Sequence, residues 1–97
     1  MTPTAKRVKA PKVFKIRKVN HNRGSEYFSE GTLEELIQYH GYTLECGQSW
    51  EYEKGNKKIN RNPKSVKALI TNLNNAVNNT AANGYAGVTY YLVEEAK

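Results

Sequence analysis

The sequence predicts a small α+β domain in which an antiparallel sheet is packed by two helices. Two segments, 12–19 and 88–93, are typical of strands, because the first alternates apolar and polar residues and the second is rich in β-branched and aromatic residues. A third segment, 66–77, repeats apolar residues at helical spacing. A chain of 97 residues, of which 38% are hydrophobic, is long enough for one small core and too short for two.

The chain is expected to begin with a flexible basic arm over 1–11, followed by a single domain over 12–97. The arm holds two prolines, several basic residues and almost no large apolar group, so burial cannot offset the entropy of ordering it. Residues 12–19 then form a strand with Phe14 and Ile16 on one face and basic side chains on the other. A turn over 20–24 and a second strand over 25–29 complete a hairpin.

A short helix is predicted to follow at Thr32. The Thr32 side chain can cap the backbone N–H of Glu35, and Glu35 can reach back to Thr32, which is a capping box. Leu33, Leu36 and Ile37 follow at helical spacing, and Gly41 is a natural C-terminal stop.

Residues 42–60 carry two patterns. Tyr42, Leu44 and Cys46 alternate with other residues, which fits either a strand or an extension of the helix. Trp50 and Tyr52 alternate with glutamates ahead of a turn-like segment, so we predict a small hairpin over 49–60.

A second, longer helix is the clearest element of the sequence. Asn62 is expected to cap it, with Pro63 at the first helical position and Asn83-Gly84 at its end. Its C-terminal half is rich in asparagine, a poor helix former, and so depends on packing. Its apolar stripe consists of Val66, Leu69, Ile70, Leu73 and Val77.

The last predicted strand, 88–93, places Val88, Tyr90 and Leu92 on one face. The predicted order is therefore β-β-α-(β-β)-α-β. As an edge strand it could pair with a second copy, although the sequence does not decide the oligomeric state.

The net charge of +6 is unevenly distributed along the chain. Residues 1–24 and 54–67 carry basic residues and no acid, whereas 25–53 carry seven Glu and no Lys or Arg. These blocks fit either mutual attraction between the segments or a basic face that meets a polyanion. Our first hypothesis is a non-enzymatic binding protein that engages an anionic partner, either nucleic acid or a nucleoprotein machine. The expected contacts are Lys6, Arg7, Lys9, Lys57, Lys58, Arg61 and Lys64.

The alternative hypothesis is a protein-protein inhibitor of an enzyme that has a basic, nucleic-acid-binding groove. Tyr and Trp are frequent anchors of protein interfaces, and here they adjoin glutamates that can occupy a basic groove. The expected surface is Glu45, Trp50, Glu51, Tyr52 and Glu53. Tyr52, beside the basic block, is also the best candidate for stacking on a nucleic acid base.

Catalysis and metal binding find little support in the residues. His40 and Cys46 are the only conceivable base and nucleophile, and the chain contains no Asp. His21, His40 and Cys46 do not have the spacing of a common metal site. Phosphate-binding glycine loops and sequence-reading motifs of nucleic-acid-binding folds are also missing. We therefore expect no enzyme activity, no cofactor and no metal.

The cellular location follows from equally simple features. No apolar run approaches the roughly 20 residues of a membrane span. The basic N-terminus lacks the apolar core of a secretory signal, and a single cysteine forms no internal disulfide. We expect a cytoplasmic protein with no membrane partner.

The segment EGTLEELIQY, residues 30–39, resembles a phrase common in small bacteriophage-encoded accessory proteins. In those proteins a short N-terminal hairpin leads into a helix of this kind. The resemblance implies a phage protein that binds and modulates a host machine in the host cytoplasm. The partner is then a host nucleoprotein machine under the first hypothesis and a host or defence enzyme under the alternative. The resemblance assigns no functional residues.

Overall fold

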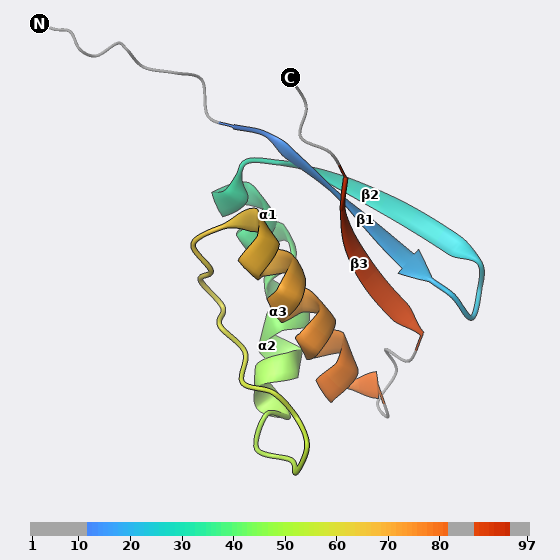
Figure 1. The fold of residues 1–97 in the computed structure, drawn as a ribbon, viewed down its shortest axis with the longest axis vertical. Helices are drawn as coiled ribbons and strands as arrows, with labels where there is room; N and C mark the ends of the chain where they lie inside the picture. Colours follow the sequence, from blue (N-terminus) through green and yellow to red (C-terminus); the bar gives the residue numbers. More distant parts are fainter. Residues whose placement is uncertain (1–11, 82–86, 94–97) are drawn as a thin grey trace, which may run out of the picture.

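A three-stranded antiparallel sheet organises the computed structural model, which describes residues 12–81 and 87–93. Strands β1 (Phe14–Asn20), β2 (Ser25–Gly31) and β3 (Val88–Val93) have the spatial order β2-β1-β3. The first strand is thus central, and the last strand of the chain lies beside it. Figure 1 shows the helices gathered to one side of this sheet. The predicted α+β class and antiparallel sheet are confirmed; the arm predicted over 1–11 lies outside the described residues.

The alternation predicted for the strands is seen in the sheet. Ile16 and Tyr90, which lies opposite Lys18 in β3, are buried on the face that meets the helices. Arg17 lies on the opposite, outer face, where the register pairs it with Phe28 and Tyr91. Because side chains alternate along a strand, Lys18 returns to the inner face two residues after Ile16.

Three helices pack on the sheet, where the sequence predicted two. They are α1 (Leu33–Tyr39), α2 (Gly41–Ser49) and α3 (Val66–Asn79). Helix α1 contacts β2, α3 contacts β3, and α2 packs mainly against α3. The core between them includes Leu36, Leu44, Leu69 and Leu73, all essentially inaccessible to solvent.

The capping box of α1 is confirmed. The Glu35 N–H donates to Thr32 Oγ1 over 3.2 Å, and the Thr32 N–H donates to Glu35 Oε1 over 2.8 Å. The helix ends at Tyr39, next to the predicted stop. However, Gly41 also begins α2, because His40 serves as the C-cap of one helix and the N-cap of the next.

The hairpin predicted over 49–60 is wrong. The alternation of Tyr42, Leu44 and Cys46 belongs to α2, and residues 50–65 form an irregular connection to α3. Side chains satisfy the backbone of this connection: the Ile59 N–H donates to Glu51 Oε2 over 3.0 Å. The stacked rings of Trp50 and Tyr52, with centroids 6.1 Å apart, belong to the turn that follows α2.

Helix α3 begins three residues later than predicted. Its N-cap is Ser65, whose hydroxyl accepts from the Ala68 N–H over 3.1 Å. The Asn62 N–H instead donates to Asn60 Oδ1 over 2.9 Å, so the chain is still turning at the position predicted for the cap. The helix ends at Asn79, and the predicted stop at 83–84 lies outside the described residues.

The asparagines of α3 bind backbone groups of neighbouring segments. Asn79 is buried; its amide nitrogen donates to the carbonyls of Gly47 and Lys57, and its Oδ1 accepts from the Lys57 N–H over 3.0 Å. Asn74 accepts from the Tyr90 N–H over 2.7 Å and donates to the Tyr90 carbonyl over 3.1 Å. The Asn74 side chain therefore takes the hydrogen bonds that a neighbouring strand would make with Tyr90 at the edge of β3. This is the edge at which the sequence allows pairing with a second copy.

A glycine sets the distance between α2 and α3. At Gly47 a Cβ atom would overlap the Cα and Cβ of Ala76, so only glycine allows the two helices to lie this close.

Among the described residues, no helix has both the length and the apolar character that crossing a bilayer requires.

Candidate anion-binding cleft

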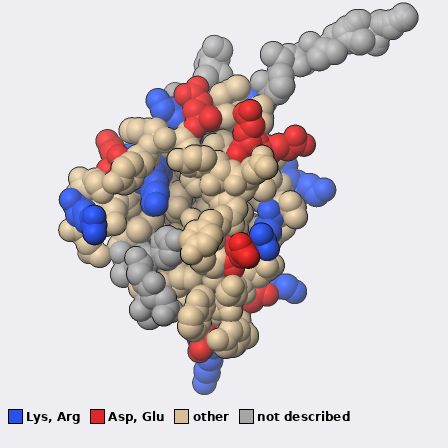
Figure 2. All heavy atoms as spheres, turned by 180° about the vertical axis from the view of Figure 1, so that it is seen from behind, with Lys and Arg blue, Asp and Glu red and all other residues tan. Residues whose placement is uncertain are grey.

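The basic residues selected from the sequence do not form one described surface. Lys6, Arg7 and Lys9 lie outside the described residues. The other four are exposed in the connection between α2 and α3, where Arg61 donates to Gln48 Oε1 over 3.5 Å; they are Lys57, Lys58, Arg61 and Lys64. On the face shown in Figure 2, Lys and Arg side chains alternate with Asp or Glu and with uncharged residues. A continuous basic face is not seen there.

The acidic-aromatic residues have divided roles. Glu51 accepts the Ile59 N–H and so supports the connection. Trp50 is half-buried, and its carbonyl accepts from the Asn56 side chain over 2.8 Å. The exposed residues of this set are Glu45, Tyr52 and Glu53.

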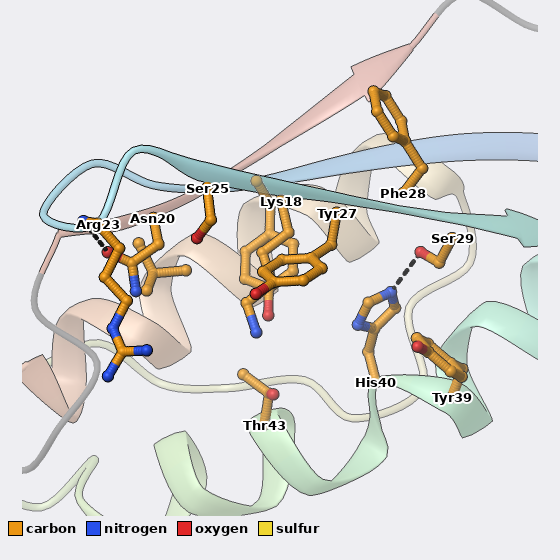
Figure 3. A pocket seen from close by; sticks show the side chains of 12 residues that line it. Lys18, Asn20, Arg23, Ser25, Tyr27, Phe28, Ser29, Tyr39, His40 and Thr43 are labelled. Atoms are coloured by element: carbon orange, nitrogen blue, oxygen red, sulfur yellow. Dashed lines mark hydrogen bonds between the residues drawn. The ribbon is translucent and has the colours of Figure 1, made fainter.

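A cleft lies at the other end of the molecule, between the inner face of the β1–β2 hairpin and the junction of α1 with α2. Its volume is about 540 Å³. Figure 3 shows Lys18 and Tyr27 projecting into it from the sheet, with His40 and Thr43 facing them from the helices. Phe28 contributes to the rim, but its ring points away from the cleft.

The register of the hairpin places the polar side chains in the cleft. Lys18 lies opposite Tyr27, and Asn20 lies opposite Ser25. All four belong to the inner face, beyond the point where the helices cover it. Diagonal neighbours across a strand pair are roughly 7–8 Å apart, so the Lys18 and Ser25 side chains can reach one group between them.

The hairpin turn holds Arg23 at the end of the same cleft. Asn20 Oδ1 accepts from the N–H groups of Asn22 and Arg23, both over 3.1 Å. Gly24 has a φ of +68°, a conformation that favours glycine. The turn is braced against the start of β3, because the His21 N–H donates to the Gly87 carbonyl over 2.7 Å. The Arg23 backbone is therefore fixed while its side chain lines the cleft.

His40 is the buried polar group of the cleft. Its Nε2 is hydrogen-bonded to Ser29 Oγ over 2.8 Å, and its ring meets Tyr39 and Tyr90 edge-on. Burial, aided by the charge of Lys18, lowers the pKa of His40 to about 4. The imidazole is therefore neutral at neutral pH, and its second nitrogen faces the open side of the cleft (Figure 3).

The charge of the cleft is uncompensated. Lys18 and Arg23 both line it, and none of its described lining residues is Asp or Glu. Neither cation forms an ion pair within the described part of the chain, although Lys18 Nζ lies over the Tyr27 ring, 6.0 Å from its centroid. The glutamates of β2 lie on the other face of the sheet, where Glu26 accepts from Arg17 Nε over 2.6 Å.

One hydroxyl group in the cleft is also unsatisfied. Ser25 Oγ is buried and has no hydrogen-bond partner among the described residues. Buried polar atoms are almost always hydrogen-bonded, so an exception needs an explanation. Two unpaired cations and an unpartnered hydroxyl together form a site suited to an anion with several acceptor oxygens.

The alternation in the first strand points to one residue of this cleft. If Phe14 and Ile16 face the core, the same alternation places Lys18 on the core side, which is an unusual position for a lysine. The contributions of Arg23 and His40 depend on the turn and on the helix junction, which the alternation does not specify.

The catalytic candidates His40 and Cys46 lie at the junction of α1 with α2 and within α2. His40 is bonded to Ser29, and Cys46 is a partly buried free thiol in α2. In the described ranges, no three His, Cys, Asp or Glu side chains gather in a way that could hold a metal ion.

Comparison with protein-family models, with curated proteins and with solved structures found no match. The resemblance to phage accessory proteins therefore stays a prediction.

Proposed function

We propose that this chain is a non-enzymatic binding protein for nucleic acid and that the cleft is its principal contact. The observation that carries the proposal is the pairing of Lys18 and Arg23 in a cleft whose described lining contains no carboxylate. Lys18 is half-buried and Arg23 is exposed, and with no carboxylate beside them both charges favour the binding of an anion. Phosphate fits this site because it accepts charge-assisted hydrogen bonds on several oxygens.

The aromatic rings at the cleft favour nucleic acid over a small inorganic anion. Tyr27 and Tyr39 line it, and their side chains are 59% and 73% exposed. Exposed aromatic rings beside cations are a common platform for unstacked bases, to which each ring contributes about 1–3 kcal/mol. Single strands, whose bases are free to stack on protein, are therefore the preferred form.

The remaining basic residues are assigned a supporting role. The exposed lysines of the 50–65 connection and the basic residues of 1–11 add to the positive field that attracts a polyanion. Their contribution is sensitive to salt and insensitive to the exact position of each charge. With a pKa of about 4, His40 is a neutral hydrogen-bonding group of the cleft at neutral pH.

The experiment compares two variants with the same change in net charge. The cleft variant carries Lys18→Gln and Arg23→Gln; the loop variant carries Lys57→Gln and Lys58→Gln. Fluorescence anisotropy with a labelled single-stranded oligonucleotide at low and physiological salt gives the affinities. The cleft variant is expected to bind at least about tenfold more weakly than the loop variant, since each charge-assisted hydrogen bond is worth about 1.5–3 kcal/mol.

Circular dichroism verifies that both variants are folded. Equal affinities for the two variants would contradict the assignment of the cleft, and no binding by the wild type at low salt would refute the function itself. Duplex of the same sequence is the comparison for strand preference, and it is expected to bind more weakly.

The inhibitor hypothesis is retained as the second candidate because of one observation. Tyr52 is 74% exposed and stacks on Trp50, which presents an aromatic surface beside Glu53. Tyr52→Ser with Glu53→Lys tests it without touching Glu51, which supports the backbone. If this hypothesis holds, these changes abolish inhibition of a nucleic-acid-processing enzyme while the cleft variant still inhibits it.

A further inference from the structure

Resting on the proposed function, we infer that the cleft binds the terminal phosphate of a nucleic acid strand, a phosphomonoester, in preference to the phosphodiesters within the strand. The inference follows from the charge of the cleft, the depth of its hydrogen-bond donor and the position of its aromatic rings.

The charge of the cleft matches a dianion. A phosphomonoester carries about −1.5 to −2 charge at pH 7 and presents three acceptor oxygens. A phosphodiester carries one negative charge. Lys18 and Arg23 supply two positive charges, and no described carboxylate in the lining reduces them. A monoester is therefore neutralised in full, whereas a diester leaves one cation uncompensated.

Ser25 Oγ, the hydroxyl without a hydrogen-bond partner, favours a terminal phosphate over an internal one. Ser25 Oγ is shielded from solvent, and the Tyr90 and Val88 side chains of β3 line the inner side of the same cleft. Because this oxygen is closed to a group the size of water, the Ser25 side chain must turn outward to meet a phosphate, and a terminal phosphate, with one substituent, requires the smaller opening. An internal phosphate has a sugar on both sides, so both directions of the chain would have to fit inside.

The first turn of α2 adds to the preference for a strongly charged anion. This nine-residue helix supplies His40 and Thr43 to the cleft, and its first turn holds no acidic residue. Its N-cap, His40, makes no side-chain capping bond and instead bonds to Ser29. The N-terminal turn of α2, where the helix dipole is positive, therefore adjoins the cleft that holds the two cations.

The size of the cleft fits one terminal nucleotide. Its volume of about 540 Å³ lies within the roughly 300–1,000 Å³ of small-ligand sites. With the phosphate beside Ser25, Tyr27 and Tyr39 remain available at the exposed part of the cleft for the terminal base. The strand then leaves the cleft toward solvent.

The experiment uses three single-stranded oligonucleotides of one sequence, each labelled internally. One has a 5′-phosphate, one has a 3′-phosphate, and one has hydroxyl groups at both ends. Either the 5′-phosphorylated or the 3′-phosphorylated oligonucleotide is expected to bind at least about tenfold more tightly than the oligonucleotide with hydroxyl groups at both ends. Ser25→Ala, which leaves the net charge unchanged, is expected to reduce this ratio, and the cleft variant is expected to remove it. Ser49→Ala, at an exposed position of α2 outside the cleft, is the matched control and should keep the ratio.

Equal binding of all three oligonucleotides overturns the terminal-phosphate inference and leaves the nucleic-acid function standing. No binding of any oligonucleotide at low salt overturns the function as well. Competition by a nucleoside monophosphate as effective as the phosphorylated strand overturns the assignment to a strand end, because the cleft then binds a free nucleotide.

Discussion

The pH dependence of stability should report directly on the burial of His40. The side chain is 7% exposed, and its burial, with the charge of Lys18 as a second cause, lowers its pKa from 6.5 to about 4. Between these pH values the unfolded chain binds a proton at this histidine and the folded chain does not. Folding is therefore fully favoured above about pH 6.5 and loses stability as the pH falls toward 4.

The size of the effect follows from the two pKa values. At 1.36 kcal/mol per pKa unit, lowering the pKa from 6.5 to about 4 corresponds to about 3 kcal/mol between the two pH limits. Small domains have a total stability of roughly 5–15 kcal/mol, so the loss is a large part of the whole.

The assay is urea unfolding followed by circular dichroism at about pH 7, 5.5 and 4.5. In the wild type, the free energy of unfolding is expected to fall steeply over this range. His40→Gln keeps a hydrogen-bonding group toward Ser29 but cannot take up the proton, so its stability should fall much less. His21→Gln is the matched control: His21 is exposed in the hairpin turn, and this variant should behave like the wild type. The reasoning is refuted if His40→Gln loses as much stability as the wild type.

Three further outcomes follow from packing, buried hydrogen bonds and binding. Gly47→Ala should lower stability by about 1–3 kcal/mol in thermal unfolding, because its Cβ overlaps Ala76, whereas Gly41→Ala, with open space around it, should raise stability slightly. Asn79→Ala should cost about 3 kcal/mol in urea unfolding because three backbone bonds are lost, and exposed Asn78→Ala should be nearly neutral. Millimolar inorganic phosphate should raise the melting temperature of the wild type but not that of the cleft variant; equal shifts would place the phosphate elsewhere.

Local patterns in the sequence were sufficient for the strands and for the first helix. Alternation through Phe14 and Ile16 determines which face of β1 is buried, since a shift of one residue would bury the charged side chains. The Thr32–Glu35 capping box is a contact between near neighbours in the chain, so the local sequence determines it.

The middle of the chain was mispredicted because its structure depends on distant partners. Alternation over three residues, as in Tyr42–Cys46, does not distinguish a strand from a helix. The connection after α2 is held by the Asn79 side chain, which bonds to the backbone of Lys57, 22 residues away. A single sequence does not reveal that pairing, and the asparagines of α3 were interpreted only as poor helix formers.

The candidate site also depends on residues that are distant in the chain. The long charge blocks predicted contacts at Lys57 and its neighbours, which lie exposed on an irregular segment. The cleft instead combines one lysine on the inner face of β1 with an arginine from the turn and a histidine from the helix junction. Of the three, only Lys18 is marked by the alternation in β1, and folding brings them together.

The most direct test of the cleft is a nuclear magnetic resonance titration of the ¹⁵N-labelled protein with a single-stranded oligonucleotide. We expect the largest amide shifts at Arg23, Ser25, Tyr27 and Thr43, together with a rise in the pKa of His40, because a bound anion stabilises the imidazolium. Shifts confined to the 50–65 connection, with the His40 pKa unchanged, would contradict the assignment of the cleft as the binding site.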